Sequence, residues 1–311
     1  MHKILISHPI VGSYSAFLFL GLLTGYLLTR RQARRAGIKG SHIDNLALLI
    51  ALVSLFGARF FSWLFYFPPG VSLWNALRDS SGGMVFYGGL IFGALGLVLY
   101  AVFAKLSLTN LLDVFAPGLA LGLAFGRIGC FLAGCCWGDL CIAPGQLAGL
   151  SPPTLAWQVH TLPLLSSPSF PLALRFPKGA GAYEQHQKLG LIDTNAELSQ
   201  PVHPVQLYEA ALAFGLCLFL LRKFSGRKWN GQTFWILIGG YSLIRFLLEF
   251  LRADNPPIYF HFTLSQVISL LLGAIALVAL LTNRRSVSPI QPVEALPSAS
   301  VPSPSTAISQ S

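Results

Sequence analysis

Seven apolar segments recur along the 311-residue chain, and each is about as long as a helix that crosses a lipid bilayer. Hydrophobic residues make up 54% of the sequence and charged residues only 10%, against about 25% charged residues in soluble globular proteins. This pattern predicts an all-α polytopic membrane protein with seven transmembrane helices. The predicted spans are 11–29, 44–66, 85–104, 110–133, 206–221, 232–251 and 262–281.

The basic residues are distributed unevenly between the connections. Twelve of the 21 Lys and Arg residues lie in alternate connections or ends, around residues 30–39, 105, 222–228 and 284–285. Six others are spread over the opposite connections, which are much longer. The positive-inside rule therefore predicts an N-terminus outside and a C-terminus in the cytoplasm. The net charge of +10 follows from this topology, so we expect the membrane, and not nucleic acid, to be the partner.

The sequence divides into a membrane domain and a tail. We expect residues 1–285 to form the seven-span domain, with the one long loop, 139–203, as a small outer head segment because it is too polar to span. Residues 286–311 are rich in Ser, Pro and Ala, a composition typical of disorder, and are predicted to be a cytoplasmic tail.

Three arginines, Arg59, Arg127 and Arg245, lie within or at the end of predicted spans, near the outer face. An arginine at bilayer depth costs about 2.5–3.5 kcal/mol on insertion scales, so each requires an anionic partner, and a phosphate group suits the planar guanidinium. Arg127 lies among glycines in the stretch 117–138, where small residues allow backbones or a bound molecule to approach closely. The alternative is a helix-packing seam from which the arginine extends to the interface.

Two carboxylates accompany these arginines. Arg245, Glu249 and Arg252 have the spacing i, i+4 and i+7, which places them on one helix face, with the carboxylate between the two arginines. This set can hold both guanidinium groups in place, or can be only a self-compensating ion pair. Glu209 lies about one turn inside the fifth span, so we expect it to be neutral or paired with an outer arginine.

The outer side of the predicted bundle therefore collects arginines, carboxylates, tyrosines and glycine-rich backbone. Arginine clusters select anionic groups, and the abundant anion in a membrane is a lipid phosphate. Such a site suits displacement at a carbon that bears a phosphate ester, because arginines neutralise the charge that develops on the leaving phosphate.

Four of the five cysteines fall within twelve residues, at positions 130, 135, 136 and 141. One or two disulfides are predicted for an outer, oxidising compartment, and a redox-active pair, a cysteine nucleophile and a metal site are the alternatives. The spacing is not a zinc pattern, since adjacent cysteines rarely bind one metal, so we expect no metal and no cofactor. The fifth, Cys217, is predicted to be a packing residue.

Four ordered motifs give the chain a family resemblance. They are Gly82–Leu90, Gly126–Gly138, His203–Glu209 and Gly240–Arg252. In sequence and order they resemble the prolipoprotein diacylglyceryl transferase family, over residues 11–282. The resemblance implies a bacterial inner-membrane enzyme that transfers a diacylglyceryl group from phosphatidylglycerol to the lipobox cysteine thiol of a prolipoprotein. A thioether forms and glycerol phosphate leaves.

The resemblance also implies roles for individual residues. Arg127 and Arg245 hold the phosphatidylglycerol headgroup and stabilise the leaving phosphate, and Glu249 orients Arg245. Tyr14 lines the site, and Gly138 shapes its edge. The remaining candidates for substrate binding are Arg59, Gly88, Gly89, Gly129, His203, Gln206, Glu209 and Arg252.

The chain departs from the family at three places. Tyr87 stands where the family carries a histidine proposed as the base for the thiol, Cys130 replaces an asparagine, and Cys135 with Cys136 replaces Glu-Leu. Tyr87 is thus the catalytic candidate at the base position, although a tyrosine of ordinary pKa near 10 is a poor base. Either thiol deprotonation is not demanding, since a cysteine of pKa about 8.5 ionises readily near arginines, or the acceptor differs. A non-catalytic lipid-binding or transport protein and a thiol–disulfide redox protein are the rival functions.

Overall fold

The computed structural model describes residues 4–7, 10–68, 70–79, 83–141, 170–252 and 262–283. The predicted tail, 286–311, lies outside the described residues, as do residues 142–169 of the predicted head segment.

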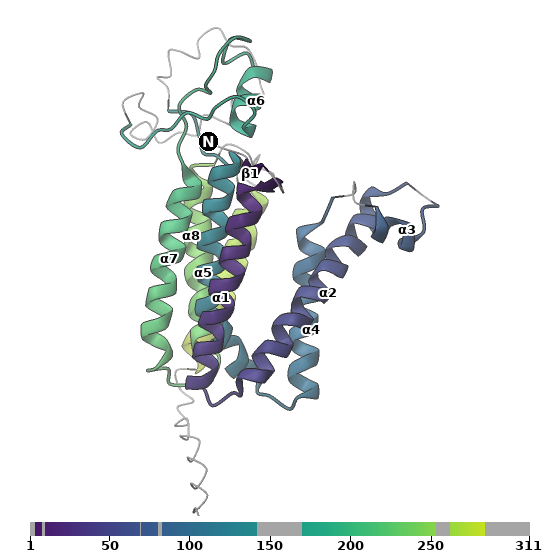
Figure 1. Ribbon diagram of the computed structural model, residues 1–311. Helices are drawn as coiled ribbons and strands as arrows, with labels where there is room; N and C mark the ends of the chain where they lie inside the picture. The colour runs from purple at the N-terminus through teal and green to yellow at the C-terminus, as the bar shows by residue number, and fades with distance from the viewer. Residues whose placement is uncertain are drawn as a thin grey trace, which may run out of the picture.

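Helices make up most of the described chain (Figure 1). The predicted all-helical architecture is confirmed for the described chain, and a short antiparallel hairpin of β1 (Ile4–Ser7) and β2 (Ile10–Gly12) precedes the first helix. The helices are α1 (Ser13–Arg35), α2 (Gly40–Tyr66), α3 (Leu73–Arg78), α4 (Phe86–Phe103), α5 (Leu108–Ala133), α6 (Gly181–Lys188), α7 (Val205–Phe224), α8 (Gln232–Glu249) and α9 (Leu264–Thr282).

Each of the predicted apolar segments is helical, and four of the described helices are long and apolar enough to cross a membrane. These are α2, α5, α7 and α9. The apolar part of α4 is shorter, and α1 and α8 are not among the four because their ends carry more polar residues. The described chain is therefore a helical protein of membrane type.

The helices form two groups. In the larger group, α5 packs against α1, α7 and α8, and α8 also packs against α7 and α9. In the smaller group, α2 and α4 pack against each other and stand beside the larger bundle (Figure 1). We refer to these groups as the main bundle and the α2–α4 hairpin.

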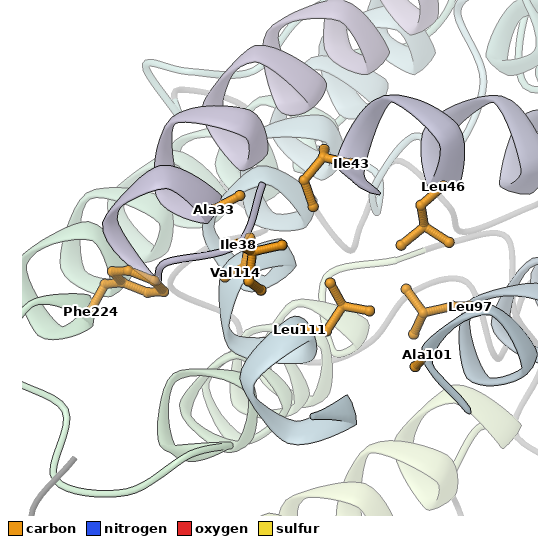
Figure 2. Close-up of a cluster of buried hydrophobic side chains, with 9 residues drawn as sticks. All are labelled: Ala33, Ile38, Ile43, Leu46, Leu97, Ala101, Leu111, Val114 and Phe224. Atoms are coloured by element: carbon orange, nitrogen blue, oxygen red, sulfur yellow. The ribbon is translucent and has the colours of Figure 1, made fainter. Parts of the chain in front are cut away.

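One apolar cluster joins the α2–α4 hairpin to the main bundle (Figure 2). Leu97 and Ala101 of α4 and Leu46 of α2 meet Leu111 of α5, and Phe224 at the end of α7 lies in the same cluster. Its remaining members are Ala33, Ile38, Ile43 and Val114. The cluster lies at the end of the molecule where α1 and α7 finish, so the hairpin is fixed to the bundle at that end.

The other end of the main bundle carries the head segment, and we call it the site end. Here α5 and α8 finish and α1, α7 and α9 begin. A small apolar core holds the described head together and includes Trp137, Phe176 and Val202, with Phe131 of α5 packed against it. An isolated β-bridge between Gly138 and Arg252 ties the chain at the start of the head to the end of α8, and three further bridges lie within the head. The head therefore fixes the backbone around the site end.

Candidate functional site

Glu209 lies at the centre of a buried ion network at the site end. Its Oε2 atom is 3.0 Å from Nε of Arg127 in α5 and 4.0 Å from Nη1 of Arg245 in α8. The hydroxyl of Tyr241 donates a hydrogen bond of 2.7 Å to Oε1 of Glu209. Glu209 is thus paired with an arginine of the site end, as its position in the fifth apolar segment requires.

Glu249 forms the second half of the network. Its Oε2 atom is 2.9 Å from Nη2 of Arg245 and 3.7 Å from Nε of Arg252, so the carboxylate lies between the two arginines as their spacing indicates. The hydroxyl of Thr263 donates to Oε1 of Glu249 over 2.8 Å. Arg245 also donates to the hydroxyl of Ser265, at 3.2 Å.

The local sequence explains how Thr263 and Tyr241 reach the two carboxylates. Thr263 is the N-cap of α9 and forms a capping box with Gln266. The capping box fixes the Thr263 side chain within hydrogen-bonding distance of Glu249. Tyr241 lies four residues before Arg245, on the same face of α8. No role was predicted for Tyr241, Thr263 or Ser265. The Thr-x-x-Gln pattern indicates the capping box, and the i, i+4 spacing of Tyr241 and Arg245 indicates their shared helix face.

Charge and exposure are distributed asymmetrically in the network. In the ion pairs of the described residues, three guanidinium groups face two carboxylates, so these five groups together carry one surplus positive charge. The carboxylate side chains are at most 1% exposed, whereas the side chains of Arg127 and Arg245 keep 19% and 15% of their surface accessible. An approaching anion therefore meets arginine and not carboxylate.

Tyr14 and Gly129 contact each other beside this network. A Cβ atom at Gly129 would lie 3.3 Å from the ring of Tyr14, so the first turn of α1 packs closely against α5 two residues beyond Arg127. Tyr14 remains 42% exposed. The tyrosine therefore borders the network without being enclosed by it.

Gly138, His203 and Gln206 hold the backbone around the network. The N–H of Gly138 donates to the carbonyl of His203 at 2.9 Å, and a Cβ atom at Gly138 would lie 2.6 Å from the carbonyl oxygen of Leu251, which leaves no space for a side chain. Gln206 is buried and donates to the carbonyl of Cys135 at 2.7 Å. The ring of His203 is buried against Phe170, with Nδ1 3.5 Å from the Tyr208 hydroxyl.

Arg59, Tyr87, Gly88 and Gly89 belong to the α2–α4 hairpin. Arg59 donates to the carbonyls of Gly83, at 3.0 Å, and Asp79. Gly88 and Gly89 pack on α2, and a Cβ atom at Gly88 would lie 2.7 Å from Cβ of Phe61. Tyr87, in the first turn of α4, is 61% exposed. The predicted site residues thus fall into two sets, one in the main bundle and one on the hairpin.

The cysteines are arranged differently from the prediction. All five are free thiols, so the predicted disulfides are not formed. The sulfur atoms of Cys130, Cys135 and Cys136 lie within 4.8 Å of one another, a three-sulfur group that the sequence analysis missed. Cys141 is buried apart from them, and burial raises its pKa to about 12. Cys217 packs in an apolar cluster between helices, as predicted.

The charges of nearby arginines also act on the three-sulfur group. Hydrogen bonds from the Cys130 and Cys135 thiols lower the pKa of Cys136, and the nearby charges of Arg252 and Arg127 act in the same direction. The pKa of Cys136 therefore lies below the ordinary value of a thiol.

Fold and site together define a class, namely a helical membrane protein with an arginine–carboxylate network at one end of its bundle. A family profile described as prolipoprotein diacylglyceryl transferase matches residues 3–282. The chain therefore belongs to the prolipoprotein diacylglyceryl transferase family, and the predictions of this family and of an enzyme of this class are confirmed. Family membership and the apolar helices point to a bacterial inner membrane.

Three relatives illustrate the similarity. A protein of Nitratidesulfovibrio vulgaris is 31% identical over 285 residues, which cover 87% of this chain and 89% of the relative. One of Leptospira interrogans is 32% identical over 274 residues, covering 78% and 72%. One of Clostridium tetani is 27% identical over 260 residues, covering 84% and 88%. All three are named phosphatidylglycerol–prolipoprotein diacylglyceryl transferase.

Proposed function

We propose that this protein transfers the diacylglyceryl group of phosphatidylglycerol to the lipobox cysteine thiol of a prolipoprotein. The names of the relatives support both substrates. The observation that carries the proposal is the ion network, in which Arg127 and Arg245 share the buried carboxylate of Glu209 and keep one surplus positive charge. A monoanionic lipid phosphate complements that surplus charge.

The proposed topology has seven spans, with the N-terminus outside and the C-terminus in the cytoplasm. The basic ends of α1 and α7, with Arg34, Arg35, Arg222 and Lys223, lie at the end of the main bundle opposite the site end. The positive-inside rule assigns those ends to the cytoplasm. The ion network and the head segment then face the outside, where the substrate thiol is presented. Residues 1–285 act as one domain in this proposal.

In the proposed reaction, the substrate thiolate attacks the glycerol carbon that bears the phosphate ester. A carbon–sulfur bond forms as the carbon–oxygen bond breaks, the electron pair of the broken bond stays on the phosphate oxygen, and glycerol phosphate leaves. Arg127 and Arg245 neutralise the charge that develops on this leaving group. Donors fixed before the reaction are effective because they do not reorganise during it.

The carboxylates are positioning residues in this mechanism. Glu209 holds Arg127 and Arg245 at once, and Glu249 holds Arg245 and Arg252. Gly138, Gln206 and His203 fix the surrounding backbone, and Tyr14 with Gly129 borders the lipid headgroup.

The α2–α4 hairpin supplies the second set of residues. Tyr87 occupies the base position of the motif and its side chain is 61% exposed, and its ionised phenolate form is the proposed acceptor of the thiol proton. Arg59 fixes the connection before α4 through its bonds to Gly83 and Asp79, and Gly88 and Gly89 let α4 lie close to α2. These residues place Tyr87 for the acceptor.

The test uses purified protein with phosphatidylglycerol and a lipobox peptide, and mass spectrometry detects the thioether and the released glycerol phosphate. We expect both products with the parent protein and neither with Arg127→Ala. Arg30→Ala is the matched control, because Arg30 forms its ion pair with Asp44 near the opposite end. Lipid that stays bound without glycerol phosphate release would support a non-catalytic lipid-binding protein. Exchange of the cysteines with a dithiol, without a thioether product, would support a redox protein.

A further inference from the structure

The three-sulfur group at the end of α5 has the geometry of a ligand set. Cys130 is in the last turn of α5, and Cys135 and Cys136 follow the helix. Their sulfur atoms all lie within 4.8 Å of one another, so small side-chain rotations bring all three to bonding distance of one ion. In the part of the chain that the structure describes, no His, Asp or Glu joins the group.

Backbone conformation explains how two adjacent cysteines face the same point. Gly134 has a φ of 69° and ends α5 in the left-handed region, and Cys136 has a φ of 58°. A left-handed non-glycine residue is uncommon and costs about 1–3 kcal/mol, so the surrounding structure must impose it. The two left-handed residues turn the chain back so that adjacent side chains do not point to opposite sides. Adjacent cysteines on ordinary backbone rarely bind one metal because their side chains diverge, and this backbone is not ordinary.

Hydrogen bonds fix this turn on both sides. The N–H of Cys135 donates to the carbonyl of Cys130 at 3.1 Å, and Gln206 donates to the carbonyl of Cys135 at 2.7 Å. The N–H of Gly181 donates to the carbonyl of Gly134 at 3.1 Å, and that of Gly138 donates to His203 at 2.9 Å. A rigid supporting shell is what holds a metal-ligand set in place before the ion arrives.

We propose that Cys130, Cys135 and Cys136 form a binding site for one soft, thiophilic metal ion, with Cu(I) as the best fit. Thiolate ligands select soft ions such as Cu(I), and a structural zinc site has four protein ligands where this site offers three. Three thiolates around Cu(I) carry two negative charges. The positive charges of Arg127 and Arg252, which act on Cys136, offset part of this negative charge. The three cysteines are half-buried residues and are not enclosed in the core.

The experiment titrates the detergent-solubilised protein with Cu(I), under anaerobic and reducing conditions, against a colorimetric Cu(I) chelator. We expect one Cu(I) per chain. Cys130→Ser, Cys135→Ser and Cys136→Ser should each weaken binding by at least about 100-fold, since loss of even an outer-sphere partner costs about 10–100-fold. Cys217→Ser and Cys141→Ser are the controls and should bind as the parent does.

X-ray absorption at the copper edge of the parent protein is the second measurement, because it does not depend on the folding of a variant. Three sulfur neighbours and no nitrogen or oxygen neighbour are expected. Absence of bound copper, equal binding by the triple serine variant, or a nitrogen or oxygen ligand at the ion would each overturn the proposal. The outcome is separate from transferase activity, because no lipid or peptide is present.

Discussion

Replacing Glu209 by glutamine keeps the shape of the side chain and removes the charge on which two arginines depend. The carboxylate is 3.0 Å from Arg127 and 4.0 Å from Arg245, and its side chain is 1% exposed. Two unit charges 4 Å apart interact by about 4 kcal/mol at an effective dielectric constant of about 20. The glutamine oxygen still accepts the hydrogen bond from Tyr241, but the amide nitrogen takes the place of Oε2 and cannot accept from Arg127, so the variant removes the charge and that contact together.

The net cost follows from comparing this attraction with desolvation. Removing one partner of a fully buried ion pair costs about 3–5 kcal/mol. Arg127 and Arg245 keep some access to solvent, so we expect the lower end, about 3 kcal/mol of unfolding free energy. Because the arginines then lose their fixed positions, kcat should fall by about 100-fold, the usual effect of a misplacement near 1 Å. Binding of the anionic lipid should not weaken, since the site gains net positive charge.

Thermal unfolding in detergent and steady-state kinetics measure these effects. Glu197→Gln is the matched control, because Glu197 is an exposed carboxylate of the head. An E209Q protein with the stability and turnover of the parent would refute the assignment of Glu209 as the residue that holds both arginines. Weaker lipid binding with unchanged kcat would refute the charge argument.

Three further predictions concern the surroundings of the network. Thr263→Val removes the donor to Glu249 and the N-cap of α9, and it should lower the unfolding free energy by about 2 kcal/mol, measured by thermal unfolding against Thr282→Val. Tyr87→Phe should reduce turnover and shift its pH profile if Tyr87 accepts the proton, and an unchanged profile would remove that role. Burial lowers the pKa of His186 to about 4, so the unfolded head binds a proton more tightly than the folded head does. The head should therefore lose up to about 3 kcal/mol of stability as the pH falls from about 6.5 to about 4. Hydrogen exchange of residues 170–200, corrected for intrinsic rates, measures this loss, and His186→Gln should abolish it.

The sequence predicted the elements of this protein better than their lateral arrangement. Apolar length alone located the long helices, to within six residues at their ends, but it did not predict the short helices α3 and α6. The spacing of Arg245, Glu249 and Arg252 indicated their shared face, and the cost of a lone buried charge indicated that Glu209 has a partner. These arguments succeed because they concern residues on one helix, or a charge that cannot remain alone in an apolar environment.

The remaining features depend on tertiary placement. Apolar length predicts that a helix spans a membrane but not which helices are its neighbours, so the sequence does not tell that Tyr87 and Arg59 belong to a hairpin joined to the main bundle at the end opposite the site end. The three-sulfur group depends on left-handed backbone at Cys136, which is imposed by contacts with Gln206 and with the head. The intrinsic preference of a cysteine is against left-handed backbone, so the sequence alone does not predict it.

We propose that the ion network binds the lipid phosphate, and a cryo-EM structure of the protein with phosphatidylglycerol in a nanodisc tests this binding. We expect the headgroup phosphate to contact the guanidinium groups of both Arg127 and Arg245, with Glu209 still between them. A phosphate bound only at Arg59 on the α2–α4 hairpin, with the network empty of lipid, would contradict it.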